Sequence, residues 1–269
     1  MISIQTNAVS IFAQDNLRVS GEFQSQTIRR LTSGYRINQS GDDAAGLAAA
    51  NRFRNDVAEL TQGVRNANDA ISALQIIDGG LNNISKMLDR LKTLATEGAS
   101  DTFTGSYASL ADEYGALRTE IDRQANNINL GAANTGYTGA LEVHIGGNVP
   151  DLTIAAIGAA GTTALGLATT ALTNKTDADA LLVEIDAAVD ALALVQGKVG
   201  TAENGLGHAI QLASSQISNY SAAESRIRDT DVAAEAANLT KAQVLQQAGM
   251  AALAQANATP QAVLSLLRS

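Results

Sequence analysis

The chain of 269 residues contains no cysteine and no tryptophan, and only 3% of its residues are aromatic. Its formal net charge of −9 argues against a dedicated nucleic-acid binder, which needs a basic face, and the lack of cysteine excludes disulfides, thiolate metal sites and cysteine catalysis. Because a compact core normally uses large rings, we expect the Ala, Leu, Ile and Val surface to be buried between long helices packed side by side.

The first 31 residues have the periodicity of an amphipathic helix. One apolar stripe is formed by Val9, Phe12, Val19 and Phe23. A second apolar set, which ends at Leu31, occupies other faces of the same helix. Apolar residues on several faces predict burial against more than one partner, whereas a helix in a single-chain bundle accounts well only for the first stripe.

A connector is predicted near residues 33–46, between two long segments of helical periodicity. Glycine tolerates backbone angles that other residues avoid, and a carboxylate can cap the helix that begins at Ala44. The alternatives are an ordinary loop between helices and, for the paired carboxylates, a cation site, although capping accounts for them better. The residues that define this connector are Gly34, Arg36, Asp42, Asp43 and Gly46.

Two later segments carry the pattern of a coiled coil. Apolar residues recur every seven positions from Leu60 to Ala95, with a second heptad row beside the first. Apolar residues from Leu206 to Ile227 alternate by four and three in the same way, so we expect the two segments to pack together. A shorter helix over 110–128 is predicted to return antiparallel onto the first of them.

Helical periodicity stops in the middle of the chain, where glycine clusters and β-branched residues take its place. The alternation over 141–145 and the residues that follow Pro150 predict a short β-hairpin. We expect 155–176 to be irregular. A last amphipathic helix is predicted from residue 231, again with apolar residues on more than one face.

The predicted fold class is mostly α: a long helical hairpin and coiled-coil bundle with a small β-hairpin or irregular tip. Residues 1–42 and 229–269 are assigned to a terminal helical domain, and residues 43–130 and 177–228 to a coiled-coil domain. Residues 131–176 are assigned to a short surface segment. Exposed apolar helices at both ends of an otherwise polar rod mark an association surface.

The sequence shows no catalytic, cofactor-binding or metal-ligating pattern. Its two histidines, His144 and His208, lack the spacing of a metal site, and we interpret them as surface or interface residues. The glycine repeat at 158–161 lacks the lysine and the strand–loop–helix setting of a phosphate loop. We therefore expect a protein that is not an enzyme and that uses no cofactor.

The amino terminus lacks a basic region followed by an apolar core and a cleavage site, so we expect no cleaved signal peptide. No apolar run approaches the roughly twenty residues that span a bilayer, so we expect no membrane insertion.

Several independent stretches closely resemble bacterial flagellin. They are 30–38 (RLTSGYRIN), 42–48 (DDAAGLA), 65–72 (RNANDAIS), 238–249 (NLTKAQVLQQAG) and 253–267 (LAQANATPQAVLSLL). The resemblance covers about the first 130 and the last 90 residues in the right order, so it is specific by the standard applied to motifs. Tyr35 departs from it, because leucine is common there.

The resemblance implies a structural subunit that self-polymerises through its terminal helices into the extracellular flagellar filament used for motility. It implies an inner core of terminal helices, a coiled-coil outer core, no large outer domains and export in an unfolded form. Its implied partners are further copies of itself, the flagellar cap, the hook–filament junction proteins and an export chaperone. The implied polymerisation interface comprises Val9, Phe12, Val19, Phe23, Leu31, Leu239, Leu245, Leu253 and Leu264.

Two alternatives share part of this pattern. The hook–filament junction adapter has a similar amino-terminal half, but the Gln- and Ala-rich ending resembles filament flagellin more. A soluble coiled-coil secretion cargo would share the heptads but not the connector or the terminal sequences.

The resemblance also implies a contact for the vertebrate innate receptor that senses flagellin, at Arg90, Leu94 and Glu113. The alternative is that Arg90 and Glu113 lie on a solvated helix face while Leu94 packs in the core.

Overall fold

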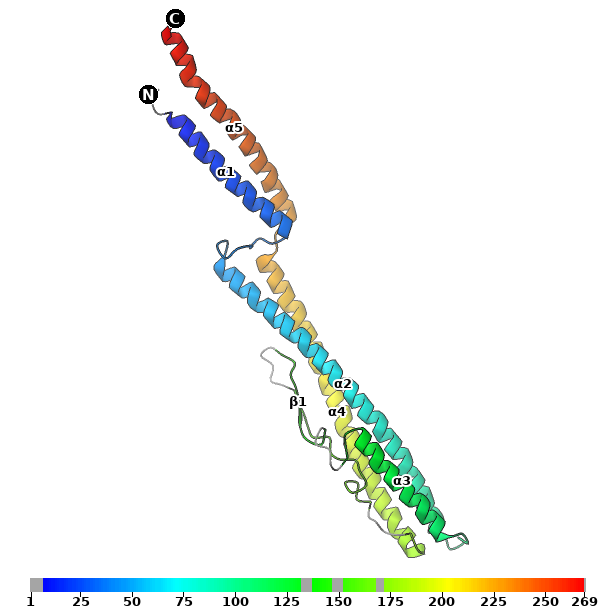
Figure 1. The fold of residues 1–269 in the computed structure, drawn as a ribbon. Helices are drawn as coiled ribbons and strands as arrows, with labels where there is room; N and C mark the ends of the chain where they lie inside the picture. Colours follow the sequence, from blue (N-terminus) through cyan, green and yellow to red (C-terminus); the bar gives the residue numbers. More distant parts are fainter. Residues whose placement is uncertain (1–6, 132–136, 147–151, 168–171, 269) are drawn as a thin grey trace. The chain divides into compact units, whose positions relative to one another are not determined.

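A computed structural model shows five helices and a two-stranded sheet within the residues that it describes, 7–131, 137–146, 152–167 and 172–268, with side chains described up to 259 (Figure 1). The mostly α fold class is therefore confirmed. Contacts divide the chain into unit 1, Met1–Asn55 with Asn219–Ser269, and unit 2, Asp56–Ser218. The expected boundaries at 42/43 and 228/229 fall inside unit 1, because the connector contacts the nearest turns of the long helices.

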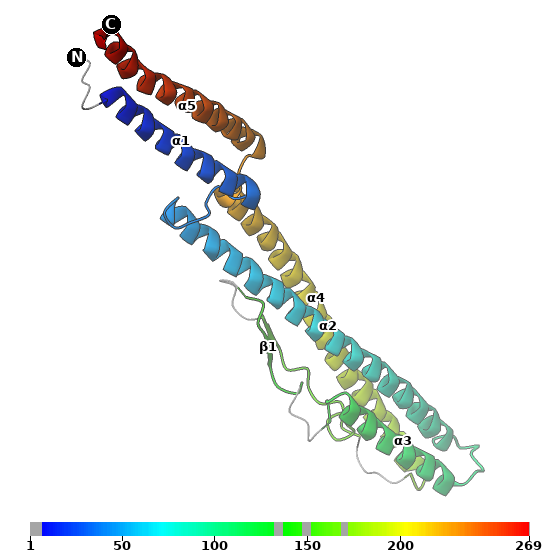
Figure 2. The same ribbon diagram turned by 45° about the horizontal axis from the view of Figure 1, so that its top comes forward.

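Unit 1 contains the two terminal helices, α1 (Ala8–Ser33) and α5 (Val232–Arg268), which pack side by side and antiparallel (Figures 1 and 2). The side chain of Asn7 caps α1 by accepting a hydrogen bond from the Ser10 N–H at 3.1 Å. At the other end Gly34 adopts a left-handed conformation, with φ 75°, and its N–H donates to the Arg30 carbonyl. The helix predicted over the first 31 residues is thus seen from residue 8, and residues 1–6 lie outside the described part.

Two long helices, α2 (Ala44–Gly98) and α4 (Lys175–Arg228), begin or end in unit 1 and supply most of unit 2. They run antiparallel in unit 2, where Lys92 Nζ lies 2.5 Å from Asp186 Oδ1 and Gln196 Nε2 donates to Asn82 Oδ1 at 3.5 Å. The predicted heptad row of α2 is completely buried: Leu60, Ala67, Leu74, Leu81, Leu88 and Ala95. Buried positions of α4 that share this core are Leu181, Ile185, Leu192, Val199 and Leu206.

The shorter helix α3 (Tyr107–Asn127) returns along α2, as the periodicity predicts, although it begins three residues earlier than expected. Its carboxyl end is packed closely, because a Cβ atom on Gly80 of α2 would overlap the side chain of Ile128. Gly79 has open space around the same position. Close packing therefore explains one of the two adjacent glycines.

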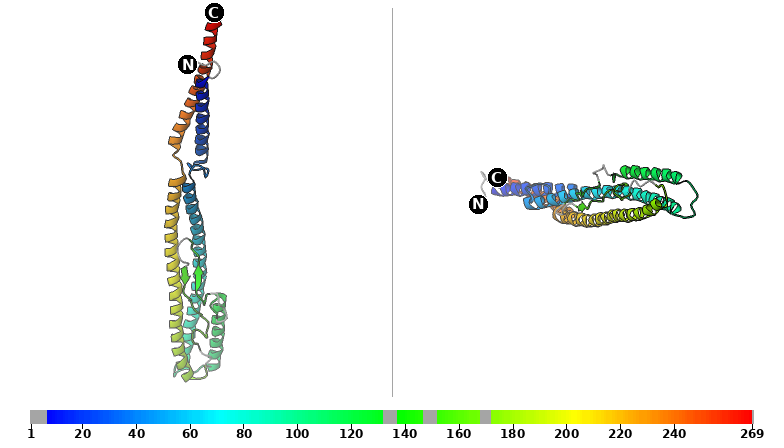
Figure 3. Two further views of the ribbon diagram at one scale, coloured as in Figure 1. Left: turned by 90° about the vertical axis from the view of Figure 1, so that its left-hand side faces the viewer. Right: turned by 90° about the horizontal axis from the view of Figure 1, so that it is seen from below.

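The predicted hairpin is present as β1 (Leu141–Val143) and β2 (Leu152–Ile154), whose strands pair antiparallel. Figure 3 shows both strands beside α2 and α4. The segment after β2 has no helix or strand in its described part, as expected. It is nevertheless not only a surface segment, because four of its large side chains are at most 3% exposed: Ile157, Leu165, Leu167 and Leu172.

Packing in unit 2 leads to a prediction on helix glycines. A Cβ atom on Gly63 of α2 would overlap the carbonyl oxygen of Ile145, whereas one on Gly115 of α3 would meet nothing within 4 Å. We expect Gly63→Ala to lower the free energy of unfolding by about 1–3 kcal/mol, because a backbone atom has to move. Gly115→Ala should raise it by up to about 1 kcal/mol, because alanine favours helix.

Urea unfolding followed by far-UV circular dichroism measures both changes. Equal effects of the two substitutions would contradict the close contact between α2 and the residues after β1.

Candidate assembly surface and connector

The face of α1 that lies against α5 carries mostly small or polar side chains. Its positions alternate by three and four residues, which is the spacing of a helix–helix seam. Ser10 and Thr27 are its buried members, with 7% and 1% exposure. The whole seam reads Ser10, Ala13, Leu17, Ser20, Gln24, Thr27 and Leu31.

The matching seam of α5 has the same spacing and is only slightly more apolar. Ala242 is fully buried, and Gly249 leaves room for Leu17, whose side chain would stand 3.4 Å from an added Cβ atom. The whole seam reads Glu235, Leu239, Ala242, Gln246, Gly249, Leu253 and Ala256. The two seams thus bury few large apolar side chains against each other.

Hydrogen bonds set the register of the pair. Asn7 Nδ2 donates to the Ala256 carbonyl at 2.8 Å, and Ser10 Oγ donates to Asn257 Oδ1 at 3.0 Å. Polar groups at seam positions favour one register because any other alignment leaves them without partners. They add specificity to the pair and little apolar burial.

Two polar atoms of this seam have no hydrogen-bond partner among the described residues. They are Thr27 Oγ1 and Glu235 Oε1, which are buried. The Glu235 carboxylate lies near a cation, since Arg30 Nη1 is 3.9 Å from the same oxygen. An unsatisfied buried polar group costs about 1–3 kcal/mol, so these positions weaken the pair.

Large apolar side chains of both helices point away from the seam. Val9, Phe12 and Val19 of α1 are 66%, 71% and 51% exposed, and Leu245 of α5 is 48% exposed. The expected interface residues whose side chains are described therefore separate into three groups. These four face outward, Phe23 is half-buried, and three belong to the seam inside the chain: Leu31, Leu239 and Leu253. The side chain of Leu264 lies outside the described residues.

The two carboxylates of the connector have different partners. Asp43 caps α2, because its Oδ1 accepts from the Gly46 N–H at 2.8 Å, as the sequence indicates. Asp42 closes the preceding loop instead, accepting from the N–H groups of Asn38 and Gln39 at 3.0 and 3.1 Å. These bonds lower the pKa of Asp42, so its stabilising effect is present above the unfolded pKa and lost as pH falls through the folded value.

The connector is tied to the segment between α4 and α5. Tyr35 forms an antiparallel bridge with Asp229, and the Thr230 N–H donates to the Gly34 carbonyl at 2.9 Å. The Arg228 guanidinium lies 4.1 Å from the centre of the Tyr35 ring, within the range of a cation–π contact. The segment that follows α1 is therefore bonded to the segment that precedes α5.

Arg36 and Ile37 hold the connector in place. The Arg36 N–H donates to the Arg228 carbonyl at 2.6 Å, and its Nη2 donates to the Ile227 carbonyl at 2.9 Å. Ile37 is completely buried, and a Cβ atom on Gly46 would overlap its side chain and the Asp43 carboxylate. Gly46 is thus required by packing.

Sequence reasoning did not identify Ile37, Arg228 or the polar seam. The isolated isoleucine in a polar stretch was a usable signal for Ile37. The contact between Arg228 and Tyr35 had no local signal, because it depends on two segments that are far apart in the chain.

The expected receptor contact lies on α2 and α3 in unit 2. Arg90 Nη2 and Glu113 Oε1 form an exposed ion pair at 2.6 Å. Leu94 is 1% exposed, so it packs in the core of unit 2 and presents no side chain to a partner.

Within the described part of the chain, no cluster of three His, Asp or Glu residues is arranged to hold a metal ion. His144 is instead near Glu59, with 3.5 Å between Nε2 and Oε1, and His208 lies exposed on α4. No described helix is long and apolar enough to cross a membrane.

Comparison with known proteins identifies the family. Residues 4–134 match the bacterial flagellin N-terminal helical region, and residues 182–267 match the bacterial flagellin C-terminal helical region. A flagellin of Halalkalibacterium halodurans is 34% identical, covering 98% of this chain and 99% of that protein. Flagellin of Bacillus subtilis and flagellin FlaB2 of Treponema pallidum are each 32% identical over the same shares.

A crystal structure of Bacillus cereus flagellin is 29% identical and covers 60% of this chain and 94% of that one, with a TM-score of 0.48. The comparisons lend no support to the hook–filament junction alternative over a filament protein. The relatives of similar length agree with a short form that has no large outer domain. The chain belongs to the bacterial flagellin family and is a structural subunit of the flagellar filament.

Proposed function

We propose that copies of this flagellin polymerise by burying the outward apolar faces of α1 and α5 against neighbouring copies. The observation that carries this proposal is the exposure of Val9, Phe12 and Leu245 although the two helices are already paired. Large apolar patches on a paired helix mark an association surface, because pairing within the chain leaves them in water. The partner of these faces is a further copy of the same chain.

The polar seam makes assembly and ordering of the terminal helices interdependent. Ordering a helix costs conformational entropy, which the small and polar seam residues offset poorly. Burying one Phe or Val side chain contributes about 1.5–3 kcal/mol. The outward faces therefore supply the missing stabilisation only in the filament, and we propose that the terminal helices are disordered in the free subunit and fold on assembly.

The connector is proposed to transmit the position of one terminal helix to the other. Hydrogen bonds join Gly34–Arg36, which follow α1, to Arg228–Thr230, which precede α5. The end of α1 and the start of α5 are therefore held at one joint. This joint would set the orientation in which the apolar faces meet a neighbouring copy.

Further partners follow from the family. We propose that the flagellar cap, the hook–filament junction proteins and an export chaperone bind this chain, and that it leaves the cell unfolded through the flagellar secretion apparatus. The exposed apolar residues of the α5 segment, Val244, Leu245 and Met250, support a chaperone contact, because they remain in water until assembly unless a partner binds them. A contact with the vertebrate flagellin receptor would rest on Arg90 and Glu113, which are exposed and paired.

The assembly surface predicts the effect of removing single apolar side chains. We expect Phe12→Ser to raise the critical concentration for seeded polymerisation about tenfold or more, because it removes one large apolar side chain, 71% exposed in the subunit, that a neighbouring copy would cover. Leu245→Ser should act in the same direction. Sedimentation of filaments grown from short seeds measures the critical concentration.

Gln14→Ser is the matched control, because Gln14 is an exposed polar residue of the same helix. A wild-type critical concentration for Phe12→Ser and Leu245→Ser would contradict polymerisation through these faces.

The connector predicts a change in protease sensitivity. We expect Asp42→Ala to speed tryptic cleavage after Arg36 several-fold in assembled filaments, because the loop loses the acceptor of two backbone N–H groups. Ser40→Ala, a change at an exposed position of the same loop, serves as the control. Identical cleavage rates of the two variants, followed by mass spectrometry, would remove Asp42 from this role.

A further inference from the structure

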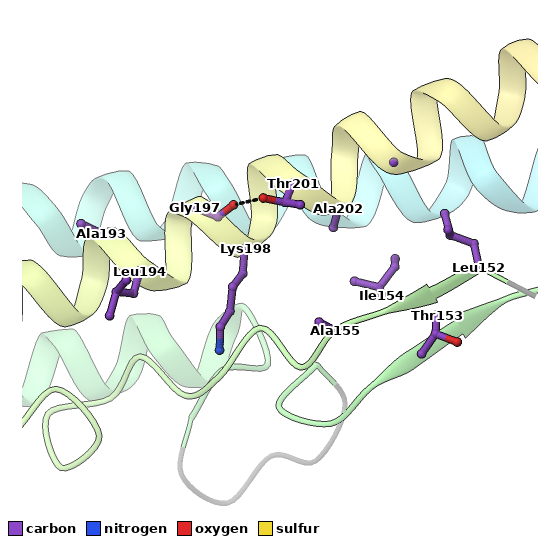
Figure 4. A pocket seen from close by; sticks show the side chains of 11 residues that line it. Leu152, Thr153, Ile154, Ala155, Ala193, Leu194, Gly197, Lys198, Thr201 and Ala202 are labelled. Atoms are coloured by element: carbon purple, nitrogen blue, oxygen red, sulfur yellow. Dashed lines mark hydrogen bonds between the residues drawn. The ribbon is translucent and has the colours of Figure 1, made fainter.

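A groove in unit 2 is lined by β2 and by one face of α4 (Figure 4). Its volume is about 700 Å³, and most of its lining is apolar. On α4 it is bordered by Leu194, which is 71% exposed, and by Lys198, while Ile154 and Ala155 line the opposite side. An exposed leucine beside a groove is apolar surface that unit 2 leaves uncovered.

The helix glycines in this groove have no packing reason within the described chain. A Cβ atom on Gly197 or Gly205 of α4 would meet nothing within 4 Å, unlike one on Gly63 or Gly80, which are packed closely. Glycine costs about 1 kcal/mol in a helix relative to alanine. Without Cβ atoms at Gly197 and Gly205, the backbone of α4 is exposed along the groove.

The same unit carries a second exposed apolar position, on α2. Ile76 of α2 is 68% exposed, and Gly79 beside it has open space around its α carbon. Asp69 lies seven residues before Ile76, on the same side of the helix and about 10.5 Å away along its axis. Among the described residues Asp69 takes part in no ion pair.

The groove offers the complementary groups at the same separation. Lys198 and Gly205 are also seven residues apart on α4, which again gives about 10.5 Å along the axis. Within the described chain Lys198 has no carboxylate partner. An Ile76 side chain placed over the Ala202–Gly205 end of the groove would thus bring Asp69 to Lys198.

We infer that the groove between β2 and α4 of one subunit receives the Ile76 face of α2 from a second copy of this chain, with Asp69 paired to Lys198. Because groove and face are different surfaces, the contact is heterologous, which is the type of contact that builds an open helical filament when its rotation does not close a ring. The inference rests on the assembly proposed above, but it uses unit 2 rather than the terminal helices.

The chain has no cysteine, which allows a direct test by cross-linking. Two single variants, Ile76→Cys and Ala202→Cys, are mixed, assembled from seeds and treated with a short bismaleimide. Because each subunit carries one thiol, every cross-link joins two subunits. We expect a 76–202 dimer from filaments, identified by peptide mass spectrometry, and none from unassembled subunits. The control mixture replaces Ile76→Cys with Lys86→Cys, on another side of α2.

Exchanging the charges of Asp69 and Lys198 tests whether these two residues pair between subunits. Lys198→Glu and Asp69→Lys should each raise the critical concentration about tenfold, because like charges then face each other, and the double variant should return to within about threefold of wild type. Lys86→Glu should leave assembly unchanged. Circular dichroism of each variant checks that the helices are retained.

The outcomes separate this inference from the proposed terminal interface. Filaments that form normally but give no 76–202 dimer would overturn it and leave the terminal interface intact. Charge effects that add in the double variant instead of cancelling would also overturn it. Loss of assembly in Phe12→Ser alongside a 76–202 cross-link in filaments of the two cysteine variants would support both contacts.

Discussion

The structure depends on a mismatch between the two sides of its terminal helices. Where α1 faces α5 the side chains are small or polar, as in Ser10, Thr27 and Ala242, whereas Phe12 and Val9 point outward. In an ordinary two-helix hairpin the large apolar groups occupy the seam, because the seam is the only surface that the chain can bury by itself. Here the seam supplies alignment, and the large apolar side chains remain exposed.

In the long helices, by contrast, most large apolar side chains face the core of the chain itself. In unit 2 the heptad leucines of α2 are completely buried against α3 and α4, and α3 ends where Ile128 packs on Gly80. The chain thus combines a unit with a buried apolar core and a terminal pair whose large apolar side chains remain exposed.

The elements with regular periodicity were predictable from the sequence. Leu74, Leu81 and Leu88 repeat every seven residues, and this period indicates a seam whichever helix lies opposite. The hairpin strands and the cap formed by Asp43 have similarly local signals. The terminal stripe was recognised, but its direction was not, because apolar residues on several faces do not indicate which face meets the neighbouring helix. The core positions of the irregular segment, such as Ile157 and Leu165, carry no period at all and are buried only through distant contacts.

The partner of α1 is the last helix of the chain. Asn7 and Ala256, which share a hydrogen bond, are 249 positions apart in sequence, so closing this contact requires nearly every other residue to be present. A subunit that is cut short before α5 has no helix to align α1. Only a chain that includes both helices can therefore form the terminal pair and hold its two apolar faces in one register.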